Sequence, residues 1–371
     1  MPAPGPRVAD GQLFVYRLFD VADSIDLARA EQLAAAPKSR LALEGAGGGT
    51  AFEFPRPPVH LVLGRREIRI GGELREAEAS AHLIDTGVAS ILYKIPIAPG
   101  TALGELLPLS EALLARPTPE IDAAARREAE ALCRDLAPAL ERPHAWEGLE
   151  TYHVVFVRRF EEGEITADRL LAEAPIAELV LGETSEVPLS AAERQDVLAH
   201  NFTYQVDDLA LVHWNGAFVY EASGVEDIPD LLEFATAHLL ELRYYDALLD
   251  RELHLLYDEI EAGGSPLTNI VTRKYRTLER RVAALLLEIS EMIERLENAV
   301  KIVGDFYLAR LYQGAVRRFR LPAWQETVLR KQRLLSEVND LIGDAADTSR
   351  AELLELAIIG LILWEIIAAF H

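Results

Sequence analysis

The stretch Arg350–His371, RAELLELAIIGLILWEIIAAFH, decides how the chain is organised. Between Leu356 and Phe370 the one charged residue is Glu365. Ser349 and Glu352 form an S-x-x-E capping box, which predicts that a helix begins there. A helix that is apolar on every side is not stable in water. The stretch therefore predicts either a membrane segment or a helix buried inside an assembly.

The length of the apolar segment fits both alternatives. A helix from residue 356 to 370 rises roughly 22 Å, whereas a hydrocarbon core is about 30 Å thick and usually takes about 20 apolar residues. A buried ionisable residue in a membrane usually faces protein or water, so Glu365 is expected to point at another subunit. Gly360 would permit close approach of a second helix. The predicted membrane or oligomer contacts are Glu355, Gly360, Trp364 and Glu365.

Composition limits the class of protein. The chain has 371 residues, of which half are hydrophobic, so it is long enough for two or more domains with sizeable cores. A net charge of −23 excludes a nucleic-acid-binding surface, which needs a basic face. It also argues against an electrostatic hold on anionic lipid, so a membrane contact would come from apolar insertion. The single cysteine, Cys133, and the absence of a signal-peptide pattern favour a reducing compartment.

The residues up to about Gly224 predict an α+β domain with a mostly antiparallel sheet. Strand patterns and turn signals alternate there, and the clearest is the hairpin in which Leu209–Trp214 and Ala217–Glu221 flank Asn215-Gly216. Helix starts are predicted at Asp23 or Ser24, Thr118, Thr166 and Ser190. Strands are predicted at 13–19, 59–64, 67–70, 74–85, 88–97 and 149–160, and helices at 103–114 and from 118 to just before Pro143.

From Pro229 onward the sequence predicts long helices. One runs to Ala262, and Gly263-Gly264 then separates it from a second helix. The apolar positions of both helices alternate spacings of four and three, which is typical of a coiled-coil seam. In the first helix Asp246 departs from this pattern. A two-glycine turn favours folding of the two helices into an antiparallel hairpin, with pairing to another subunit as the alternative. The seam residues are Asp246, Leu278, Val282, Leu285, Ile289, Met292 and Leu296.

Two polar features stand out in the helical region. Asp246 interrupts the apolar seam, and we expect it to fix helix register or to pair with Arg243 or Arg251. A basic neighbourhood then appears in an otherwise acidic chain. It is interpreted as a solvated face that pairs with acidic helices, or as a patch near lipid headgroups or an acidic partner. Its members are Arg317, Arg318, Arg320, Arg330, Lys331 and Arg333.

No local motif predicts a reaction. The nine histidines are scattered, and no two stand at metal-ligand spacing with a carboxylate. The glycine run Gly45–Gly49 lacks the residues of a phosphate-binding loop and is interpreted as a turn. We therefore predict no catalytic, cofactor-binding or metal-binding residues, and the chain is not expected to be an enzyme. A triad assembled from distant residues remains a separate alternative.

The C-terminus resembles the "required for meiotic nuclear division" family. The resemblance rests on Leu354-Glu355, the apolar run and Glu365-Ile366, and more weakly on the stretch 304–309, GDFYLA. Leu356 departs from the pattern, because the family often has tryptophan there. The resemblance implies a membrane-associated oligomer anchored by its terminal helix. Eukaryotic members support mitochondrial translation, and the family gives no catalytic residues to carry over.

These observations lead to one leading hypothesis and two alternatives. The first is a non-enzymatic, homo-oligomeric scaffold on the cytoplasmic side of the inner membrane of a bacterium. It would comprise an α+β domain (1–224), a coiled-coil-like helical domain (225–349) and a hydrophobic C-terminal helix (350–371). The second is an enzyme or small-ligand-binding α+β domain without a local motif. The third is a soluble cytoplasmic oligomer whose terminal helices are buried together.

Overall fold

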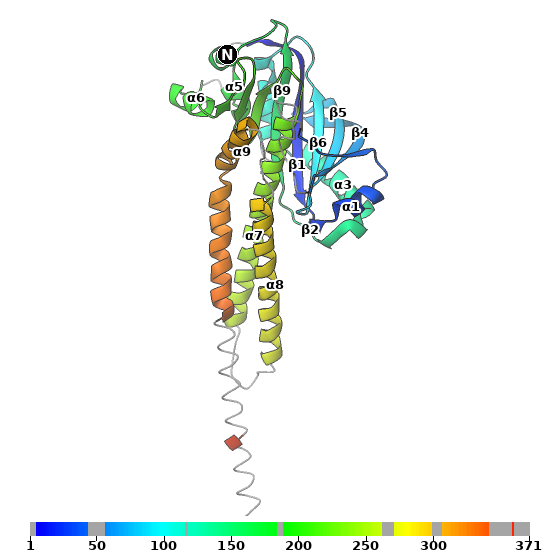
Figure 1. Ribbon diagram of the computed structural model, residues 1–371, viewed down its shortest axis with the longest axis vertical. Coiled ribbons are helices and arrows are strands. Elements are labelled where there is room, and N and C mark those ends of the chain that lie inside the picture. Colours follow the sequence, from blue (N-terminus) through cyan, green and yellow to red (C-terminus); the bar gives the residue numbers. More distant parts are fainter. Residues whose placement is uncertain are drawn as a thin grey trace, which may run out of the picture. The chain divides into compact units, whose positions relative to one another are not determined.

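The computed structural model describes residues 5–43, 56–115, 118–183, 188–261, 271–298, 306–340 and 358–359. Contacts divide the chain into two compact units (Figure 1). The sheet unit comprises Met1–Tyr244 and Leu296–Pro322, and the helical unit comprises Tyr245–Arg295 and Ala323–His371. The prediction of a mostly antiparallel sheet followed by helices is confirmed. The predicted domain boundaries at 224 and 349 stay predictions.

A ten-stranded sheet forms the centre of the sheet unit. Its order is β10-β11-β12-β9-β1-β6-β5-β4-β3, and β7 also pairs with β1. Each pair is antiparallel except β12 with β9. The strands are β1 Arg7–Asp20, β3 Lys38–Arg40, β4 Val59–Ile70, β5 Glu73–Leu83, β6 Val88–Pro96, β7 Thr101–Ala102, β9 Glu150–Phe160, β10 Asn201–Phe202, β11 Leu209–Val212 and β12 Gly216–Tyr220. A separate pair joins β2 (Ala22–Ile25) to β8 (Leu140–Pro143).

One face of the sheet carries the main hydrophobic core. Side chains alternate along a strand, so Leu13, Val15 and Phe19 of β1 point into this core. Arg17 shares this face, is 1% exposed and forms a 2.6 Å ion pair with Asp122 of α3. The helices of the N-terminal part are α1 Leu27–Leu33, α2 Leu107–Leu114, α3 Pro119–Asp135, α4 Ala167–Glu173, α5 Ile176–Leu181 and α6 Ala191–Leu198, with short 3-10 turns η1 Leu103–Leu106 and η2 Ala137–Ala139.

The opposite face of the sheet is covered by the first turns of α7 (Asp227–Glu261) and by α9 (Phe306–Arg318). The phenolic hydroxyl of Tyr312 in α9 lies 2.9 Å from Nδ1 of His238 in α7. The ring of Phe319, directly after α9, packs against Tyr152 of β9 at a centroid distance of 5.4 Å. These contacts hold α7 and α9 together on one sheet face (Figure 1).

Two glycines allow close approach of neighbouring strands. Gly87, in the turn between β5 and β6, has φ +108°, and a Cβ there would lie 1.7 Å from the carbonyl oxygen of Ala22. Gly216 follows Asn215 in the predicted hairpin, and a Cβ there would lie 2.4 Å from the His153 ring. The hairpin itself is confirmed, because β11 and β12 pair antiparallel through Val212 and Ala217.

The helical unit brings together parts of α7, α8 (Val271–Asn298) and a helix over 321–340 (Figure 1). The hydroxyl of Tyr245 lies 3.4 Å from Oε1 of Glu288, and Nη2 of Arg281 lies 2.6 Å from Oε1 of Glu252. Because the later residue of α7 contacts the earlier residue of α8, the two helices run antiparallel. Nζ of Lys331 lies 2.6 Å from a carboxylate oxygen of Asp246. Lys331 of the third helix therefore pairs with Asp246, a partner that the sequence did not indicate.

Some helix ends differ from the prediction because distant strands pair. Asp26 caps α1 by accepting a 3.0 Å hydrogen bond from the Arg29 N–H, whereas Asp23 lies inside β2. Similarly, α3 ends at Asp135 because η2 and then β8 follow it. Both differences arise from the pairing of β2 with β8, which joins segments far apart in the sequence. The predicted caps Thr166 and Ser190 are confirmed.

The C-terminal predictions fall largely outside the described residues. Of the stretch 350–371 the structure describes Ile358 and Ile359, which are 56% and 46% exposed. Across the described ranges, no helix combines the length and the apolar character that a membrane crossing requires. The presence of an apolar terminal helix, of a coiled coil and of an oligomer stays a prediction.

Candidate anion-binding site

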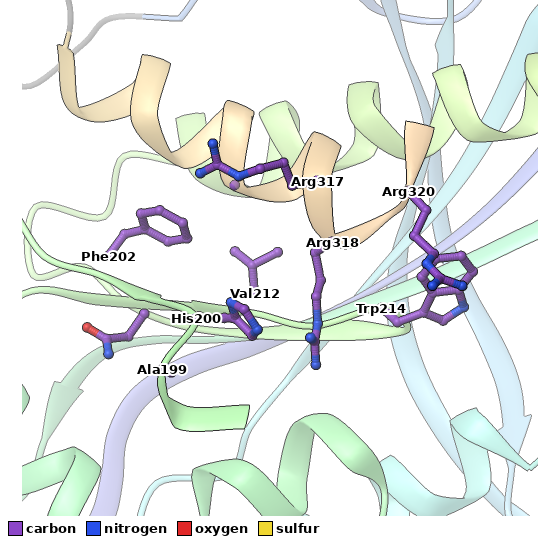
Figure 2. A pocket seen from close by; sticks show the side chains of 10 residues that line it. Ala199, His200, Phe202, Val212, Trp214, Arg317, Arg318 and Arg320 are labelled. Atoms are coloured by element: carbon purple, nitrogen blue, oxygen red, sulfur yellow. The ribbon is translucent and has the colours of Figure 1, made fainter. Parts of the chain in front are cut away.

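A cavity of about 700 Å³ lies in the sheet unit, between the C-terminal end of α9 and the edge of the sheet formed by β10, β11 and β12 (Figure 2). The arginines around it come from the end of α9 and the turn after it, and the residues on the sheet side are a mixture of polar, aromatic and aliphatic ones. The lining residues are Ala199, His200, Asn201, Phe202, Val212, Trp214, Gly314, Arg317, Arg318 and Arg320.

The end of α9 and the turn after it contribute three arginines to the lining of this cavity. Phe319 is buried and anchors the chain just after the helix. The N–H of Arg320 then donates a 3.1 Å hydrogen bond to the carbonyl of Arg317, and Arg320 adopts φ +55°. Arginine rarely occupies this left-handed region, which usually holds glycine at a helix end. The turn therefore brings Arg317, Arg318 and Arg320 to one site at some cost in backbone energy.

Close contact between α9 and β10 shapes the cavity. A Cβ at Gly314 would lie 2.1 Å from the ring of Phe202, so the absence of a side chain lets the helix approach the strand. Figure 2 shows Arg318 pointing from α9 towards His200 and the β11–β12 hairpin, with Arg320 near Trp214. The cavity thus combines cationic groups from one segment with aromatic rings from another.

The arginine charges are weakly compensated. Nη1 of Arg318 lies 3.9 Å from the carboxylate of Asp196, and Nε of Arg318 has no hydrogen-bond partner among the described residues. Neither Arg317 nor Arg320 forms an ion pair with a carboxylate of the described part of the chain. The negative end of the α9 dipole favours cations at this position, which accounts for part of the clustering. Like charges repel one another, and an anion bound in the cavity would reduce the repulsion among the lining arginines.

The two histidines near the arginines are held in the neutral state. Burial, together with the charges of Arg318 and Arg317, lowers the pKa of His200. Burial, followed by Arg318 and His200, lowers the pKa of His213 to about 4. The positive charge of the cavity at pH 7 therefore comes from the guanidinium groups. A neutral His200 can still donate or accept one hydrogen bond.

The chemistry of the lining suits binding of a phosphate group. Guanidinium groups present a planar fork of N–H donors that matches phosphate oxygens. Trp214 and Phe202 offer apolar surface for an attached organic group. The one imidazole in the lining is that of His200, whose pKa is lowered, and the lining includes no hydroxyl, thiol or carboxylate. These groups can bind and orient an anion, and they do not form a nucleophile–base pair.

The residues predicted from the sequence lie at several separate places in the structure. Arg317, Arg318 and Arg320 line the cavity, whereas Lys331 forms ion pairs with Asp246 and Asp250. The contributions of His200 and Trp214 were missed because they lie about a hundred positions before the arginines. Val282, Leu285 and Ile289 are buried in the helical unit. Glu355, Gly360, Trp364, Glu365 and the side chains of Leu278, Met292 and Leu296 lie outside the described residues.

Comparison with known proteins places the N-terminal part in a family. The family model for the N-terminal domain of uncharacterized protein MJ0711 matches residues 10–227. The chain belongs to this family. Uncharacterized protein MJ0711 of Methanocaldococcus jannaschii is 25% identical over 200 residues, which are 52% of this chain and 58% of that protein. No solved structure matches the chain.

The family match concerns the sheet unit and leaves function open. It includes the β10–β12 side of the cavity and ends before α9, which supplies the arginines. The matched chain covers less than two thirds of the curated relative, whose description names no activity. The family is one of unknown function, and the resemblance to the "required for meiotic nuclear division" family stays a prediction.

Proposed function

We propose that the sheet unit binds a small organic phosphate in the cavity between α9 and the β10–β12 edge. The observation that carries this proposal is that Arg317, Arg318 and Arg320 all line one cavity in a chain of net charge −23. An acidic protein repels anions in general, so a local cluster of cations with few carboxylate partners points to selective recognition. This develops the small-ligand-binding alternative drawn from the sequence.

The size and lining of the cavity support a ligand larger than inorganic phosphate. About 700 Å³ lies within the usual range of small-molecule sites, roughly 300–1,000 Å³. The guanidinium groups would contact the phosphate oxygens, and Trp214 with Phe202 would contact an apolar or planar moiety. We therefore expect a phosphate compound that carries an aromatic ring, such as a nucleotide, to bind more tightly than inorganic pyrophosphate.

The first test is isothermal titration calorimetry of the full chain with adenosine 5′-diphosphate, inorganic pyrophosphate and citrate. Each of the two phosphates is expected to bind with a stoichiometry of one molecule per chain, and citrate is expected to bind more weakly than either. Arg318→Gln should weaken binding about 10- to 100-fold, because a hydrogen bond to a charged group contributes about 1.5–3 kcal/mol. Raising the salt concentration should weaken binding further.

Arg330→Gln is the matched control. It removes the same charge from the same basic neighbourhood, but Arg330 is exposed and absent from the cavity. Wild-type affinity in this variant is expected. If both variants lose affinity equally, binding depends on net charge and not on the cavity. If no saturable binding of either phosphate occurs, the proposed function is wrong.

A second proposal concerns the C-terminal stretch. The apolar character of 350–371 and the exposure of Ile358 and Ile359 support a role for it in docking on lipid or on another copy of the chain. The ligand-binding unit would then belong to a membrane-associated oligomeric scaffold, as the family resemblance implies. Membrane fractionation with a carbonate wash, on the full chain beside a chain ending at Ser349, tests this. Equal solubility and equal size of the two would contradict it.

A further inference from the structure

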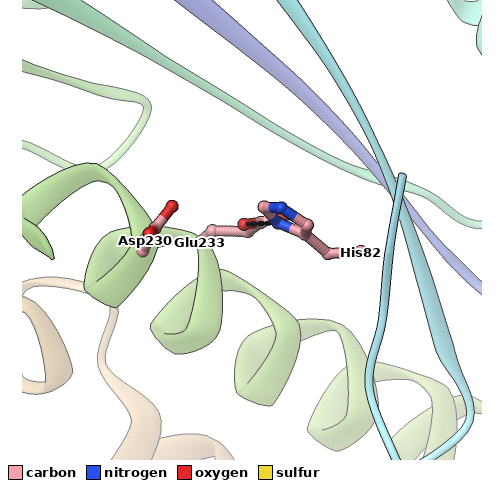
Figure 3. Close-up of side chains that lie close together, drawn as sticks. All are labelled: His82, Asp230 and Glu233. Carbon is pink, nitrogen blue, oxygen red and sulfur yellow. Dashed lines mark hydrogen bonds and ion pairs between the residues drawn. The ribbon is translucent and has the colours of Figure 1, made fainter. Parts of the chain in front are cut away.

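A separate group of ligand-type side chains lies between α7 and β5 (Figure 3). His82, Asp230 and Glu233 each offer one nitrogen or oxygen atom, and these atoms all lie within 4.8 Å of one another. Nδ1 of His82 is 2.5 Å from Oε2 of Glu233. The spacing of three between Asp230 and Glu233 places both carboxylates on the same face of α7. That face covers the sheet where His82 points outward from β5.

Two members of this cluster are buried, Asp230 is half-buried, and the hydrogen bonding of the cluster is incomplete. His82 is 4% exposed and Glu233 is 3% exposed. One carboxylate oxygen of Glu233, Oε1, has no hydrogen-bond partner among the described residues. A buried polar atom without a partner costs about 1–3 kcal/mol, so an atom of this kind needs an explanation. A bound cation would satisfy Oε1 directly.

Within the described ranges, Tyr16 is a second buried polar group without a partner on this side of the sheet. It lies on the sheet face that α7 covers, is fully buried, and its hydroxyl has no hydrogen-bond partner among the described residues. Burial raises the pKa of Tyr16 well above its usual value, and the charges of Glu233 and Asp230 raise it further. The unsatisfied oxygen of the cluster itself is Oε1 of Glu233, and this atom indicates a missing partner.

A simple ion pair does not account for the whole cluster. His82 and Glu233 could form one without help, but Asp230 adds a second carboxylate beside the first. Two carboxylates in a buried site repel each other unless a proton or a cation lies between them. Lys94 does not supply that charge directly to the cluster, because its ammonium group pairs with Glu226.

We propose that His82, Asp230 and Glu233 bind one divalent first-row transition cation, Zn²⁺ or Mn²⁺. An imidazole nitrogen with two carboxylates is a donor set that these ions accept, and such a nitrogen disfavours Mg²⁺. The two carboxylates also neutralise the ion in a site from which water is largely excluded. The ion would join α7 to the sheet, and this role is independent of the arginine cavity.

The test is metal titration of the full chain after removal of metal with a chelator. Zn²⁺ or Mn²⁺ is expected to bind at one equivalent, and Mg²⁺ much more weakly. Glu233→Gln keeps the size of the side chain and removes its charge, and it should weaken binding at least about 10- to 100-fold, by analogy with loss of groups supporting a metal. His254→Gln is the control, because His254 is an exposed histidine of the helical unit.

A second measurement covers variants that fold poorly. Bound metal stabilises the folded state, so Zn²⁺ should raise the melting temperature of the wild-type chain and of His254→Gln. The same addition should leave the melting temperature of Asp230→Asn nearly unchanged. Absence of equimolar binding by the wild-type chain would overturn the proposal. So would wild-type affinity in a folded Glu233→Gln variant, or an equal loss in His254→Gln.

Discussion

Nη1 of Arg318 lies 3.9 Å from Oδ2 of Asp196, at the outer limit of an ion pair. By contrast, Nε of Arg17 lies 2.6 Å from the carboxylate of Asp122 within the sheet unit. Arg17 is fully buried and has the partners that a buried cation requires. Arg318 is half-buried and keeps an unsatisfied Nε. This difference separates an arginine that stabilises the fold from one that is available to a ligand.

The positive φ of Arg320 gives a way to separate binding from stability. Arg320→Gly should stabilise the protein by about 1 kcal/mol or leave it unchanged, because glycine adopts φ +55° without the steric cost that arginine bears. The same change should weaken binding of adenosine 5′-diphosphate, because one guanidinium group is lost. Urea unfolding and calorimetry on the same sample measure both effects. Destabilisation of the variant would contradict this view of the turn.

Burial of His238 predicts loss of stability in acid. Burial lowers the pKa of His238 from 6.5 to about 4. The folded state therefore favours the neutral ring. The contribution of this ring to the free energy of unfolding is complete above pH 6.5 and is lost as the pH falls from 6.5 towards 4. In this window, His238→Gln should reduce the slope of the free energy of unfolding against pH by up to about 1.4 kcal/mol per pH unit. Urea unfolding of the wild-type chain and the variant at pH 7 and pH 5 measures this slope. The same slope in both proteins would contradict the prediction.

The turn between β5 and β6 depends on Gly87. Gly87→Ala should cost about 3 kcal/mol or more, because the new Cβ would lie 1.7 Å from the backbone oxygen of Ala22 and φ is +108°. Gly72→Ala is the matched control, since Gly72 also has a positive φ of +84°, but a methyl group there would meet no atom within 4 Å. A cost of about 1 kcal/mol is expected there. Equal losses in thermal unfolding would show that steric contact is unimportant.

Lys331 joins the helix over 321–340 to α7. Its Nζ lies 2.6 Å from Asp246 and 2.7 Å from Asp250, and the side chain is 16% exposed. Lys331→Met should destabilise the unit by about 1–3 kcal/mol, because Asp246 loses its cation in a half-buried position. Arg333→Met, at an exposed position of the same helix, should cost much less. Urea unfolding compares the two, and similar costs would argue against a role for the ion pairs.

Local signals in the sequence predicted local features correctly. The Asn215-Gly216 turn and the caps Thr166 and Ser190 depend on residues within a few positions of one another. The cap of α1 was misplaced because β2 pairs with β8, which a local pattern does not reveal. The pairing of Asp246 with Lys331 was also missed, since Lys331 lies 85 positions away.

The candidate sites were harder to predict for the same reason. The basic neighbourhood was visible as a run of arginines, but its cavity needs His200 and Trp214 from an earlier segment. His82 and Glu233 stand 151 positions apart and carry no spacing motif. A sheet that brings distant strands and helices together creates such sites without leaving a local pattern.

Chemical modification of arginines tests the central claim most directly. The full chain would be treated with phenylglyoxal with and without saturating adenosine 5′-diphosphate, and the modified positions would be found by peptide mass spectrometry. We predict that the nucleotide protects Arg317 and Arg320 while the exposed Arg330 and Arg333 react equally in both samples. Equal modification of all four arginines with and without the nucleotide would contradict a phosphate-binding site at the end of α9.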